Sequence, residues 1–304
     1  MYILITGGSG FIGRHLEGCL KERGHSVTSI SLRECDLTKA GTLEKSYHLQ
    51  YDLIYHLAAW TQAGDFCLRY GGDQWVINQQ INTNVLEWWQ KRQPRAKLVA
   101  LGTSVSYSTE DDLTEEKFMI GIPSEKFYAY AMSKRMLYAG LISLEKQYGL
   151  KYLFLVPSTI YGPFYHTDGR QMHFIFDLIR KIMNGKLHGE PVVLWGDGYQ
   201  CRELVFINDF VEIMLQLTTI CENDIVNIGA GEEFTIRHFA QLICNIAGYD
   251  FDTIQFDTTQ YVGAKSKCLA INKLQSLLPG LKLITLEDGL SETIQWFNKE
   301  LNRV

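Results

Sequence analysis

The hydrophobic positions in the first half of the chain form short continuous runs that alternate with longer stretches of helical spacing. Continuous apolar runs are typical of strands that are buried on both faces. Apolar residues at i, i+3, i+4 and i+7 are typical of amphipathic helices. Strands that alternate with helices predict repeated strand–helix units around a parallel sheet. The pattern therefore predicts an α/β fold with a doubly wound parallel sheet.

The expected elements follow directly from these runs. The predicted strands are Tyr2–Thr6, Val27–Leu32, Leu53–Ala58, Lys97–Leu101, Tyr152–Val156 and Asp224–Ile228. The predicted helices are Phe11–Arg23, Ile77–Arg92, Tyr128–Tyr148, Thr235–Ala247 and Leu286–Leu301. Gly24 is the expected stop of the first helix, since glycine commonly follows a helix C-terminus.

The hydrophobic pattern of the sequence changes near Tyr161, where glycines and prolines divide the chain into short pieces with isolated apolar runs. We expect a parallel-sheet domain over residues 1–165, to which residues 205–230 return. A second, smaller α/β domain would consist of residues 166–204 and 231–304. A chain of 304 residues is long enough for two such domains.

Composition excludes several classes of protein. The 29 Lys and Arg against 34 Asp and Glu give a net charge of -5, which argues against a nucleic-acid binder. No apolar run approaches the roughly 20 residues that cross a bilayer, and the N-terminal run is too short for a signal-peptide core. The seven cysteines are scattered without a C-x-x-C pair, which favours neither a disulfide framework nor a metal site. A cytoplasmic globular protein without a metal is expected.

Three glycines follow the first predicted strand with regular spacing. Gly7, Gly10 and Gly13 lie between that strand and the first helix. In this position glycines allow a tight turn and close approach of the backbone to a pyrophosphate, while the helix N-terminus supplies N–H groups. Glycines alone occur in many turns, but their place between strand and helix favours a dinucleotide site.

The end of the second strand bears on the choice between NAD and NADP. NAD sites usually place a carboxylate about 20 residues after the glycines, on the ribose 2′-hydroxyl. Here the end of the second strand, Ser29 to Arg33, contains no acid before Glu34. The serines near Arg33 would suit a 2′-phosphate, with Arg14 adding charge. We expect NADP, although Arg33 could instead be a solvated loop residue. The Asp36 carboxylate is placed to meet the adenine amino group.

A tyrosine and a lysine share one face of a predicted helix. Tyr130 and Lys134 stand at i and i+4. A nearby cation favours the phenolate and lowers the tyrosine pKa from about 10, which suits acid–base catalysis. The alternative is a core tyrosine with a surface lysine, but the hydroxyls of Thr103 and Ser104 follow a predicted strand, at the edge where open α/β sheets bind ligands. Neighbouring tyrosines have no lysine four residues later.

Together these motifs resemble a known family. T-G-G-x-G-F-I-G at the N-terminus, H-L-A-A at 56–59, G-T-S-V-S-Y at 102–107 and Y-A-M-S-K at 130–134 are similar to extended short-chain dehydrogenases/reductases of the nucleotide-sugar epimerase/dehydratase type. V-P-S-T-I-Y-G-P at 156–163, V-L-W-G-D-G at 193–198 and the positions of His173, Arg202 and Lys267 resemble the GDP-L-fucose synthase group of that family. The resemblance implies a Rossmann domain, a substrate domain and a homodimer formed through the helix that bears Tyr130 and its neighbour.

The resemblance also implies roles for single residues. Tyr130 would transfer a proton, Lys134 would bind the nicotinamide ribose and lower the Tyr130 pKa, and Thr103, with Ser104 as the fallback, would hydrogen-bond the sugar. His173 would be the epimerising histidine, although alone it would be read as a core or surface residue. Trp195, Arg202 and Lys267 would bind the nucleotide sugar, and Asn78 would support the sheet or a proton path. The positions implied to contact the dinucleotide are Gly7, Gly10, Phe11, Ile12, Gly13, Arg14, Arg33, Asp36, Leu37, Leu57, Ala58, Ala59, Tyr130, Lys134, Pro157 and Ile160.

Two departures from the family pattern limit the reaction. Fucose synthases have a second acid/base, a cysteine, where this chain has Val105, and dehydratases have an Asp-Glu pair where it has Ser104 and Val105. We therefore expect NADPH-dependent reduction of a nucleotide-diphospho-4-keto-6-deoxy sugar, with a GDP group, without dehydration and with little or no inversion at C3 and C5. The alternatives are a UDP-sugar 4-epimerase with retained NAD and, outside the enzymes, a dinucleotide-sensing regulator on the same fold.

Overall fold

The computed structural model describes residues 1–46, 49–109, 112–260 and 264–301. They form two compact units, and the chain passes between them more than once. Unit 1 consists of Met1–Pro157 and Val211–Ile228. Unit 2 consists of Ser158–Phe210 and Gly229–Val304.

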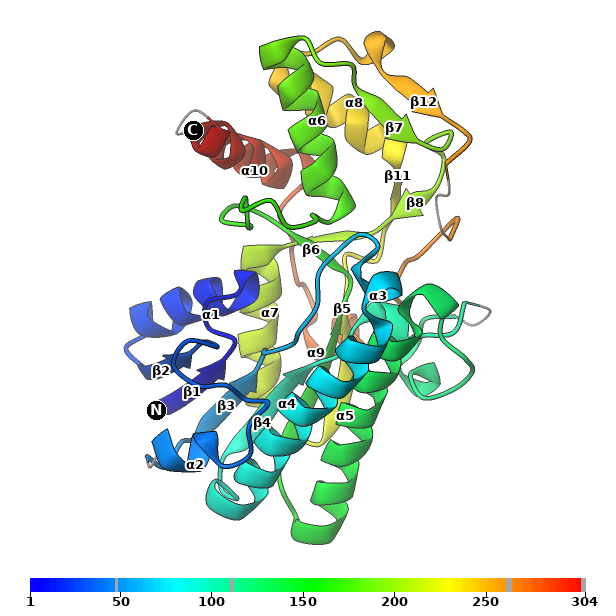
Figure 1. Cartoon of the computed structure of the whole chain (residues 1–304). Helices are drawn as coiled ribbons and strands as arrows, with labels where there is room; N and C mark the ends of the chain where they lie inside the picture. The colour runs from blue at the N-terminus through cyan, green and yellow to red at the C-terminus, as the bar shows by residue number, and fades with distance from the viewer. Residues whose placement is uncertain (47–48, 110–111, 261–263, 302–304) are drawn as a thin grey trace. The chain divides into compact units, whose positions relative to one another are not determined.

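Unit 1 contains a six-stranded sheet in the order β10-β5-β4-β3-β1-β2, in which every pair is parallel (Figure 1). Its strands are β1 (Tyr2–Thr6), β2 (Ser26–Ile30), β3 (Leu53–His56), β4 (Lys97–Leu101), β5 (Tyr152–Pro157) and β10 (Asp224–Ile228). The order changes direction at β1, because β2 lies on one side of it and β3 on the other. Open α/β sheets bind ligands at the carboxyl ends of strands at such a reversal. The α/β fold expected from the sequence is confirmed.

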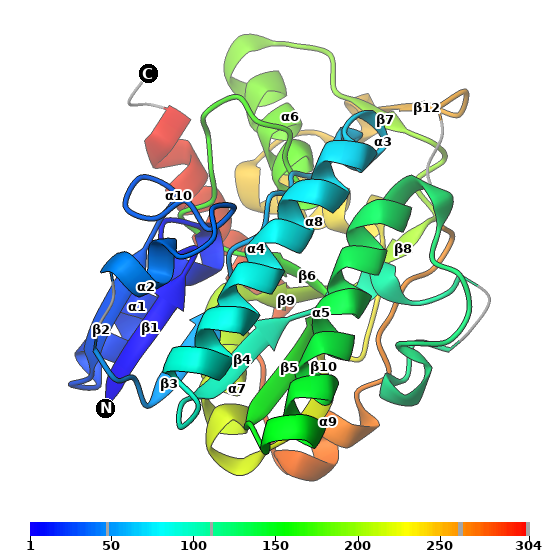
Figure 2. The same cartoon turned by 60° about the horizontal axis from the view of Figure 1, so that its bottom comes forward.

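Helices cover this sheet because its strands are apolar on both faces. Ile3, Leu4 and Ile5 of β1 are fully buried. Three of the covering helices are α1 (Phe11–Glu22), α4 (Gly71–Arg92) and α5 (Tyr128–Tyr148), and α4 and α5 lie side by side in front of the sheet in Figure 2. A Cβ at Gly140 of α5 would lie 2.7 Å from the Leu86 side chain of α4, so the two helices pack closely.

The remaining elements of unit 1 are short helices, and unit 2 contains both strands and helices. Unit 1 also contains α2 (Thr42–Ser46), α3 (Phe66–Arg69), η1 (Ser104–Ser106), η2 (Glu115–Lys117) and η3 (Glu125–Phe127). Three strand pairs of unit 2 are β6 (Thr159–Tyr161) with β9 (Leu204–Phe206), β7 (Val193–Trp195) with β12 (Gln255–Asp257), and β8 (Cys201–Arg202) with β11 (Phe234–Thr235). Its helices include α6 (Phe174–His188), α8 (Ile236–Ala247), η4 (Phe251–Thr253), α9 (Asn272–Leu277) and α10 (Leu286–Leu301), while α7 (Ile207–Ile220) carries the chain into unit 1.

Several predicted boundaries were wrong. The second strand ends at Ile30 rather than Leu32, because the Ser31 carbonyl accepts the N–H groups of Glu34 and Cys35 and starts a turn. The third strand ends at His56 rather than Ala58, and the N–H of Ala58 donates to the Thr6 hydroxyl instead of to backbone. Helix α4 starts at Gly71 rather than Ile77.

Two long helices, α6 and α7, were not predicted, and the glycines and prolines around α6 had suggested short pieces there. Within α6 the glycine is a packing residue and not a break. A Cβ at Gly185 would lie 2.6 Å from the Val192 side chain. The helix ends instead at Gly189, whose φ is +68°.

A chain of buried hydrogen bonds links the middle of the six-stranded sheet to α4 and α5. The Thr6 hydroxyl lies 2.8 Å from Nδ1 of His56, and Nε2 of His56 lies 3.1 Å from Oδ1 of Asn82 on α4. The amide nitrogen of Asn82 then donates to the carbonyl of Ser133 on α5 at 3.4 Å. Because the Asn82 oxygen only accepts, the His56 proton lies on Nε2 and Nδ1 accepts from Thr6. Neutral His56 therefore completes a chain of bonds with a single direction.

His56 makes the stability of the chain depend on pH. Burial, and after it the positive charge of Lys134, lowers the pKa of His56 to about 4. Between this value and the ordinary pKa of about 6.5, the unfolded chain binds a proton at His56 and the folded chain does not. The contribution of His56 is present above about pH 6.5 and is lost as the pH falls. Between pH 6.5 and 4 we expect the free energy of unfolding to fall by about 3 kcal/mol from this residue, as measured by urea denaturation. His56→Gln should remove that part of the pH dependence, and His188→Gln, at an exposed site, should retain it. An unchanged pH dependence in His56→Gln would contradict this assignment.

Candidate active site

The glycine-rich turn lies at the reversal of strand order, between β1 and α1. Gly7 has a φ of +73°, and a Cβ there would lie 2.8 Å from the backbone nitrogen of Ala58. A Cβ at Gly13 would lie 2.4 Å from the Gly7 carbonyl oxygen. Both positions therefore require glycine, one for conformation and contact and the other for contact alone.

This turn fits an anionic group at the start of α1. The first hydrogen bond inside the helix runs from Arg14 N to Gly10 O at 3.1 Å, and Gly10 has no side chain to cap the helix. The first turn of α1 contains no acid, and Arg14 follows it as an exposed cation. Helix N-termini with N–H groups available and a positive dipole end bind phosphates. The turn therefore suits the diphosphate of a dinucleotide.

The loop after β2 contains a turn and side-chain hydrogen bonds that the sequence did not indicate. The Glu34 carboxylate accepts from the N–H of Ser31 at 2.8 Å and from the Ser31 hydroxyl. Arg33 is exposed beside it. Asp36 accepts from the backbone N–H and the hydroxyl of Thr38 at 3.1 and 2.7 Å, and its pKa is lowered by these bonds. Leu37 is buried, and its carbonyl accepts from an α4 amide.

The loop after β3 is held by two amides of α4. It contains Leu57, Ala58 and Ala59, all half-buried. Asn78 accepts from Trp60 N and donates to Trp60 O, both at 2.9 Å, and Gln74 donates to the Thr61 hydroxyl at 3.0 Å. Asn78 thus anchors this loop. The sequence showed Asn78 as a candidate but not Gln74.

The hydroxyl residues after β4 pack against α5. Thr103 caps η1 by accepting from Val105 N at 3.4 Å, and Ser104 opens that turn; both are half-buried. The Ser106 hydroxyl donates to the Ala131 carbonyl of α5 at 3.2 Å. Thr103 and Ser104 are thereby held near the turn of α5 that contains Tyr130.

Tyr130 and Lys134 share one face of α5, with Lys134 Nζ 5.8 Å from the centre of the Tyr130 ring. Burial raises the pKa of Tyr130, the nearby Cys67 adds to this, and a hydrogen bond with Thr61 opposes it. Burial also lowers the pKa of Lys134 to about 8. The expected lowering of the Tyr130 pKa by Lys134 is therefore wrong for the chain on its own. Both groups are removed from water, and desolvation is the largest cause of each shift.

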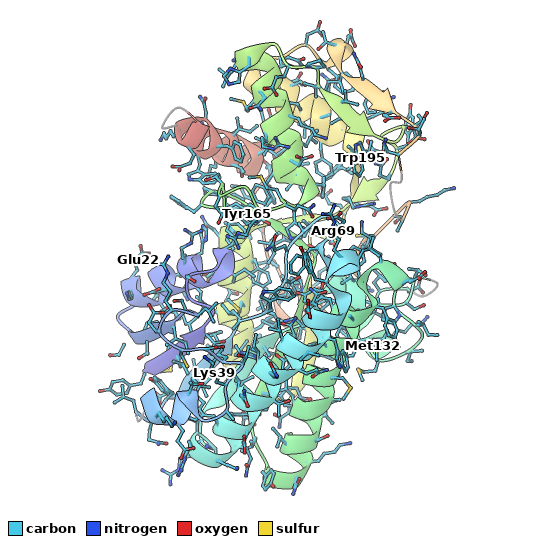
Figure 3. All side chains as sticks on the ribbon, in the orientation of Figure 1. Glu22, Lys39, Arg69, Met132, Tyr165 and Trp195 are labelled. Carbon is cyan, nitrogen blue, oxygen red and sulfur yellow. The ribbon has the colours of Figure 1, made fainter. Side chains whose placement is uncertain are left out.

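The other candidates lie in unit 2 or at its border. His173 is the exposed N-cap residue of α6, and Lys267 lies close enough to act on its charge. Burial lowers the pKa of Lys267 to about 7, and the positive charge of Arg202 adds to this. Trp195, labelled in Figure 3, ends β7 with 58% of its surface exposed. Unit 2 thus brings Arg202, Lys267 and His173 together. Pro157 is the last residue of β5 in unit 1, and Ile160 lies in β6.

Glu203 is a buried carboxylate next to Arg202 for which the sequence predicted no role. Its carboxylate is 2% exposed and accepts from Gly231 N at 2.8 Å and Leu269 N at 3.0 Å. It therefore ties together the segments that contain Arg202 and Lys267. Its sequence signal is an acid directly after Arg202 and before the apolar strand β9.

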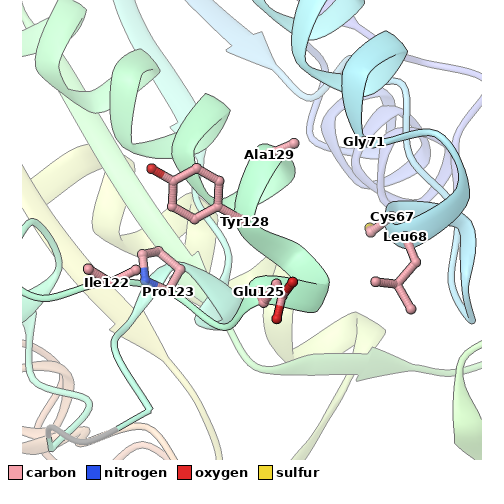
Figure 4. Close-up of a pocket in the computed structure, with 8 residues that line it drawn as sticks. All are labelled: Cys67, Leu68, Gly71, Ile122, Pro123, Glu125, Tyr128 and Ala129. Atoms are coloured by element: carbon pink, nitrogen blue, oxygen red, sulfur yellow. The ribbon is translucent and has the colours of Figure 1, made fainter.

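Unit 1 also has a surface hollow near Tyr130. It lies between the start of α4 and the start of α5, and Figure 4 shows its lining side chains. Leu68, Ile122 and Tyr128 are its exposed apolar members. The other lining residues are Cys67, Gly71, Pro123, Glu125 and Ala129.

The described residues contain neither a metal-binding cluster nor a membrane-spanning helix. No group of three or more His, Cys, Asp or Glu side chains in them could hold a metal ion. No helix among them is both long and apolar enough to cross a membrane.

The chain is similar along its whole length to known proteins. GDP-L-fucose synthase 1 of Arabidopsis thaliana is 29% identical over 313 residues, which cover 98% of this chain and 94% of that protein. GDP-L-colitose synthase of Yersinia pseudotuberculosis is 28% identical over 317 residues, covering 99% of each.

Solved structures share the fold. The GDP-L-fucose synthetase of Naegleria fowleri bound to NADP superposes with a TM-score of 0.88 at 23% identity, over 99% of this chain and 93% of that one. The UDP-glucose 4-epimerase of Thermotoga maritima with UDP-glucose gives a TM-score of 0.82 at 25% identity, over 99% and 100%. These likenesses confirm the architecture expected for an extended short-chain dehydrogenase/reductase.

The NAD dependent epimerase/dehydratase family matches residues 3–229, which is more than half of the chain. The match includes the glycine turn, Thr103, Tyr130 and Lys134, and it makes a nicotinamide dinucleotide the cofactor. The chain is therefore a member of the NAD dependent epimerase/dehydratase family.

Proposed function

We propose that this protein reduces the 4-keto group of a GDP-linked 4-keto-6-deoxy sugar with NADPH. The observation that carries the proposal is the placement of Tyr130 and Lys134 on one face of α5, next to the η1 turn that Thr103 caps. The two relatives named above are synthases of GDP sugars, which supports a GDP-linked substrate.

The charge state of Tyr130 suits reduction. Because burial raises its pKa, Tyr130 is protonated at neutral pH and holds the proton that the forming sugar hydroxyl needs. The bound nicotinamide supplies the hydride. Thr103 donates a hydrogen bond to the keto oxygen, and the Lys134 ammonium stabilises the phenolate that Tyr130 becomes.

The cofactor proposal rests on the glycine turn and on the loop after β2. We assign the diphosphate to Gly7, Gly10, Gly13 and the start of α1, and a 2′-phosphate to Arg33 with help from Arg14. Glu34 now occupies the Ser31 N–H and hydroxyl, so binding of that phosphate requires the Glu34 carboxylate to release them. The adenine amino group is assigned to Asp36.

The substrate proposal uses the cations of unit 2. Arg202 and Lys267 are the proposed partners of the sugar diphosphate, and Trp195 offers an exposed ring. A bound diphosphate would favour the charged form of Lys267, whose pKa is about 7 in the chain alone. His173 is proposed as a hydrogen-bond partner of the sugar.

We also propose a homodimer through α4 and α5. Trp75 and Val76 of α4 and Tyr128 and Met136 of α5 are exposed large apolar side chains, between 38% and 53% accessible. Exposed apolar groups on neighbouring helices favour burial against a second copy.

The dinucleotide cradle can be tested with two glycines of α1. Gly13→Ala adds a methyl group 2.4 Å from the Gly7 carbonyl and should push α1 away from the turn. We expect NADPH binding, measured by fluorescence titration, to weaken about tenfold or more, or at least about 1.4 kcal/mol. Gly18→Ala, where nothing lies within 4 Å of the added group, is the control and should bind as the parent does. Equal affinity in both variants would place the diphosphate elsewhere.

The proton donor can be tested with neighbouring tyrosines. Tyr130→Phe removes the transferable proton and little volume, so reduction of GDP-4-keto-6-deoxymannose should slow by about 100- to 10,000-fold, measured by loss of NADPH absorbance. NADPH affinity should be unchanged. Tyr128→Phe, at an exposed position, is the control and should keep the parental rate. If Tyr130→Phe kept most of the rate, the donor would be another group.

Inversion at C3 and C5 can be tested in D2O. Exchange next to a carbonyl needs an acid and a base on opposite faces of the ring, and Val105 can be neither. We expect the product to carry no deuterium at C3 or C5 by NMR beyond an enzyme-free control. Val105→Cys supplies a proton-transferring group and should raise that exchange. Deuterium at both carbons in an inverted product of the parent protein would show a full epimerase-reductase.

A further inference from the structure

Arg135, directly after Lys134 on α5, is a buried cation for which the proposed reaction has no use. It is 4% exposed, and no ion pair of the described residues includes it. A buried guanidinium is costly unless all its donors are satisfied. A charged side chain at such a buried position therefore requires a structural explanation.

Each nitrogen of this guanidinium donates a hydrogen bond to a backbone carbonyl. Nε donates to the Ser106 carbonyl at 2.9 Å, Nη1 to the Gly121 carbonyl at 2.7 Å and Nη2 to the Ile120 carbonyl at 2.7 Å. The carbonyls belong to two turns that are distant in sequence. One is the end of η1, and the other is a turn at Gly121, whose φ is +65°. Arg135 therefore fastens both turns to one position of α5.

The first of these turns is the one that Thr103 caps. Ser106 contacts α5 twice, since its hydroxyl donates to the Ala131 carbonyl and its own carbonyl accepts from Arg135. Ala131 and Arg135 stand at i and i+4, so both contacts lie along one helix face. Tyr130 directly precedes Ala131, and Lys134 directly precedes Arg135. The contacts of Ser106 with this face therefore fix the rotation of α5 about its axis. They also fix the direction in which Tyr130 and Lys134 point.

We propose that Arg135 is a positioning residue that sets the distance between the hydroxyls of Thr103 and Ser104 and the phenol of Tyr130. This inference rests on the proposed function, in which those groups act on one keto oxygen. Arginine suits the task because its planar fork has donors fixed in several directions, whereas a lysine ammonium is a single point on a flexible stem. Small shifts of reacting groups are expensive, since a displacement of about 1 Å can cost about 100-fold in rate.

A purely fold-holding role would have different consequences. The glycine turn that binds the dinucleotide follows β1, and none of the three carbonyls held by Arg135 belongs to it. General destabilisation would weaken cofactor binding together with turnover. A positioning role would lower kcat while the NADPH affinity and the KM for the sugar stay close to the parental values.

The test compares Arg135→Lys and Arg135→Met with the parent and with Lys146→Met, an exposed position of the same helix. Each protein is examined for NADPH affinity, for kcat and KM with GDP-4-keto-6-deoxymannose, and for amide hydrogen exchange. We expect Arg135→Lys to fold, to bind NADPH within about twofold of the parent and to lose about 10- to 100-fold in kcat with little change in KM. Exchange should quicken in residues 103–107 and 118–123 and stay unchanged in residues 7–16. Lys146→Met should match the parent in every measurement.

The two proposals fail in different ways. A parent protein that does not turn over the keto sugar contradicts the proposed function, while the exchange data still report on what Arg135 holds. A kcat within twofold of the parent in Arg135→Lys, or parallel losses of NADPH affinity and turnover, would overturn the positioning role. If Arg135→Met fails to fold, Arg135→Lys alone decides the question.

Discussion

The parallel direction of every strand in the sheet is the constraint on which the candidate site depends. It brings the carboxyl ends of β1, β3 and β4 to one edge, so that Gly7, Ala58 and Thr103 follow neighbouring strands. At the reversal beside β1 the backbone of Gly7 approaches Ala58 so closely that no side chain fits. The same edge is then closed by the loop that Asn78 holds and by the η1 turn. The sheet thus fixes the place of the site before any catalytic side chain is considered.

Burial decides the chemistry at that edge more than pairing does. Lys134 on the same helix face was expected to lower the Tyr130 pKa, yet desolvation raises the Tyr130 pKa and lowers that of Lys134. A protonated tyrosine is the form that a reductase needs, because the product hydroxyl takes its proton from it. The same low-dielectric surroundings keep His56 neutral, and its hydrogen bonds then join β3 to α4. Desolvation therefore keeps Tyr130 protonated and keeps His56 in the neutral form that its hydrogen bonds require.

The sequence was sufficient for the sheet and for the residues with a spaced motif, and insufficient where function depends on contacts between distant segments. Apolar runs predicted the six sheet strands to within two residues at each end, because strands buried on both faces have a plain signature. Gly185 concealed α6, since a glycine required by packing against Val192 looks the same in sequence as a helix stop. Arg135 and Glu203 were missed for another reason. Their partners are backbone groups of remote turns, and no pattern of residue types reveals a carbonyl or an N–H.

Hydride transfer to C4 of the sugar defines the proposed reaction, and isotopic labelling follows the transferred atom itself. The protein would be incubated with NADPH that carries deuterium in the transferable position at nicotinamide C4, together with GDP-4-keto-6-deoxymannose in ordinary water, and the product would be examined by NMR. We expect deuterium at C4 of the sugar and at no other carbon, with one NADP+ formed for each product. A sugar that remains a 4-ketone, or one reduced at C4 without deuterium there, would contradict the proposed reaction.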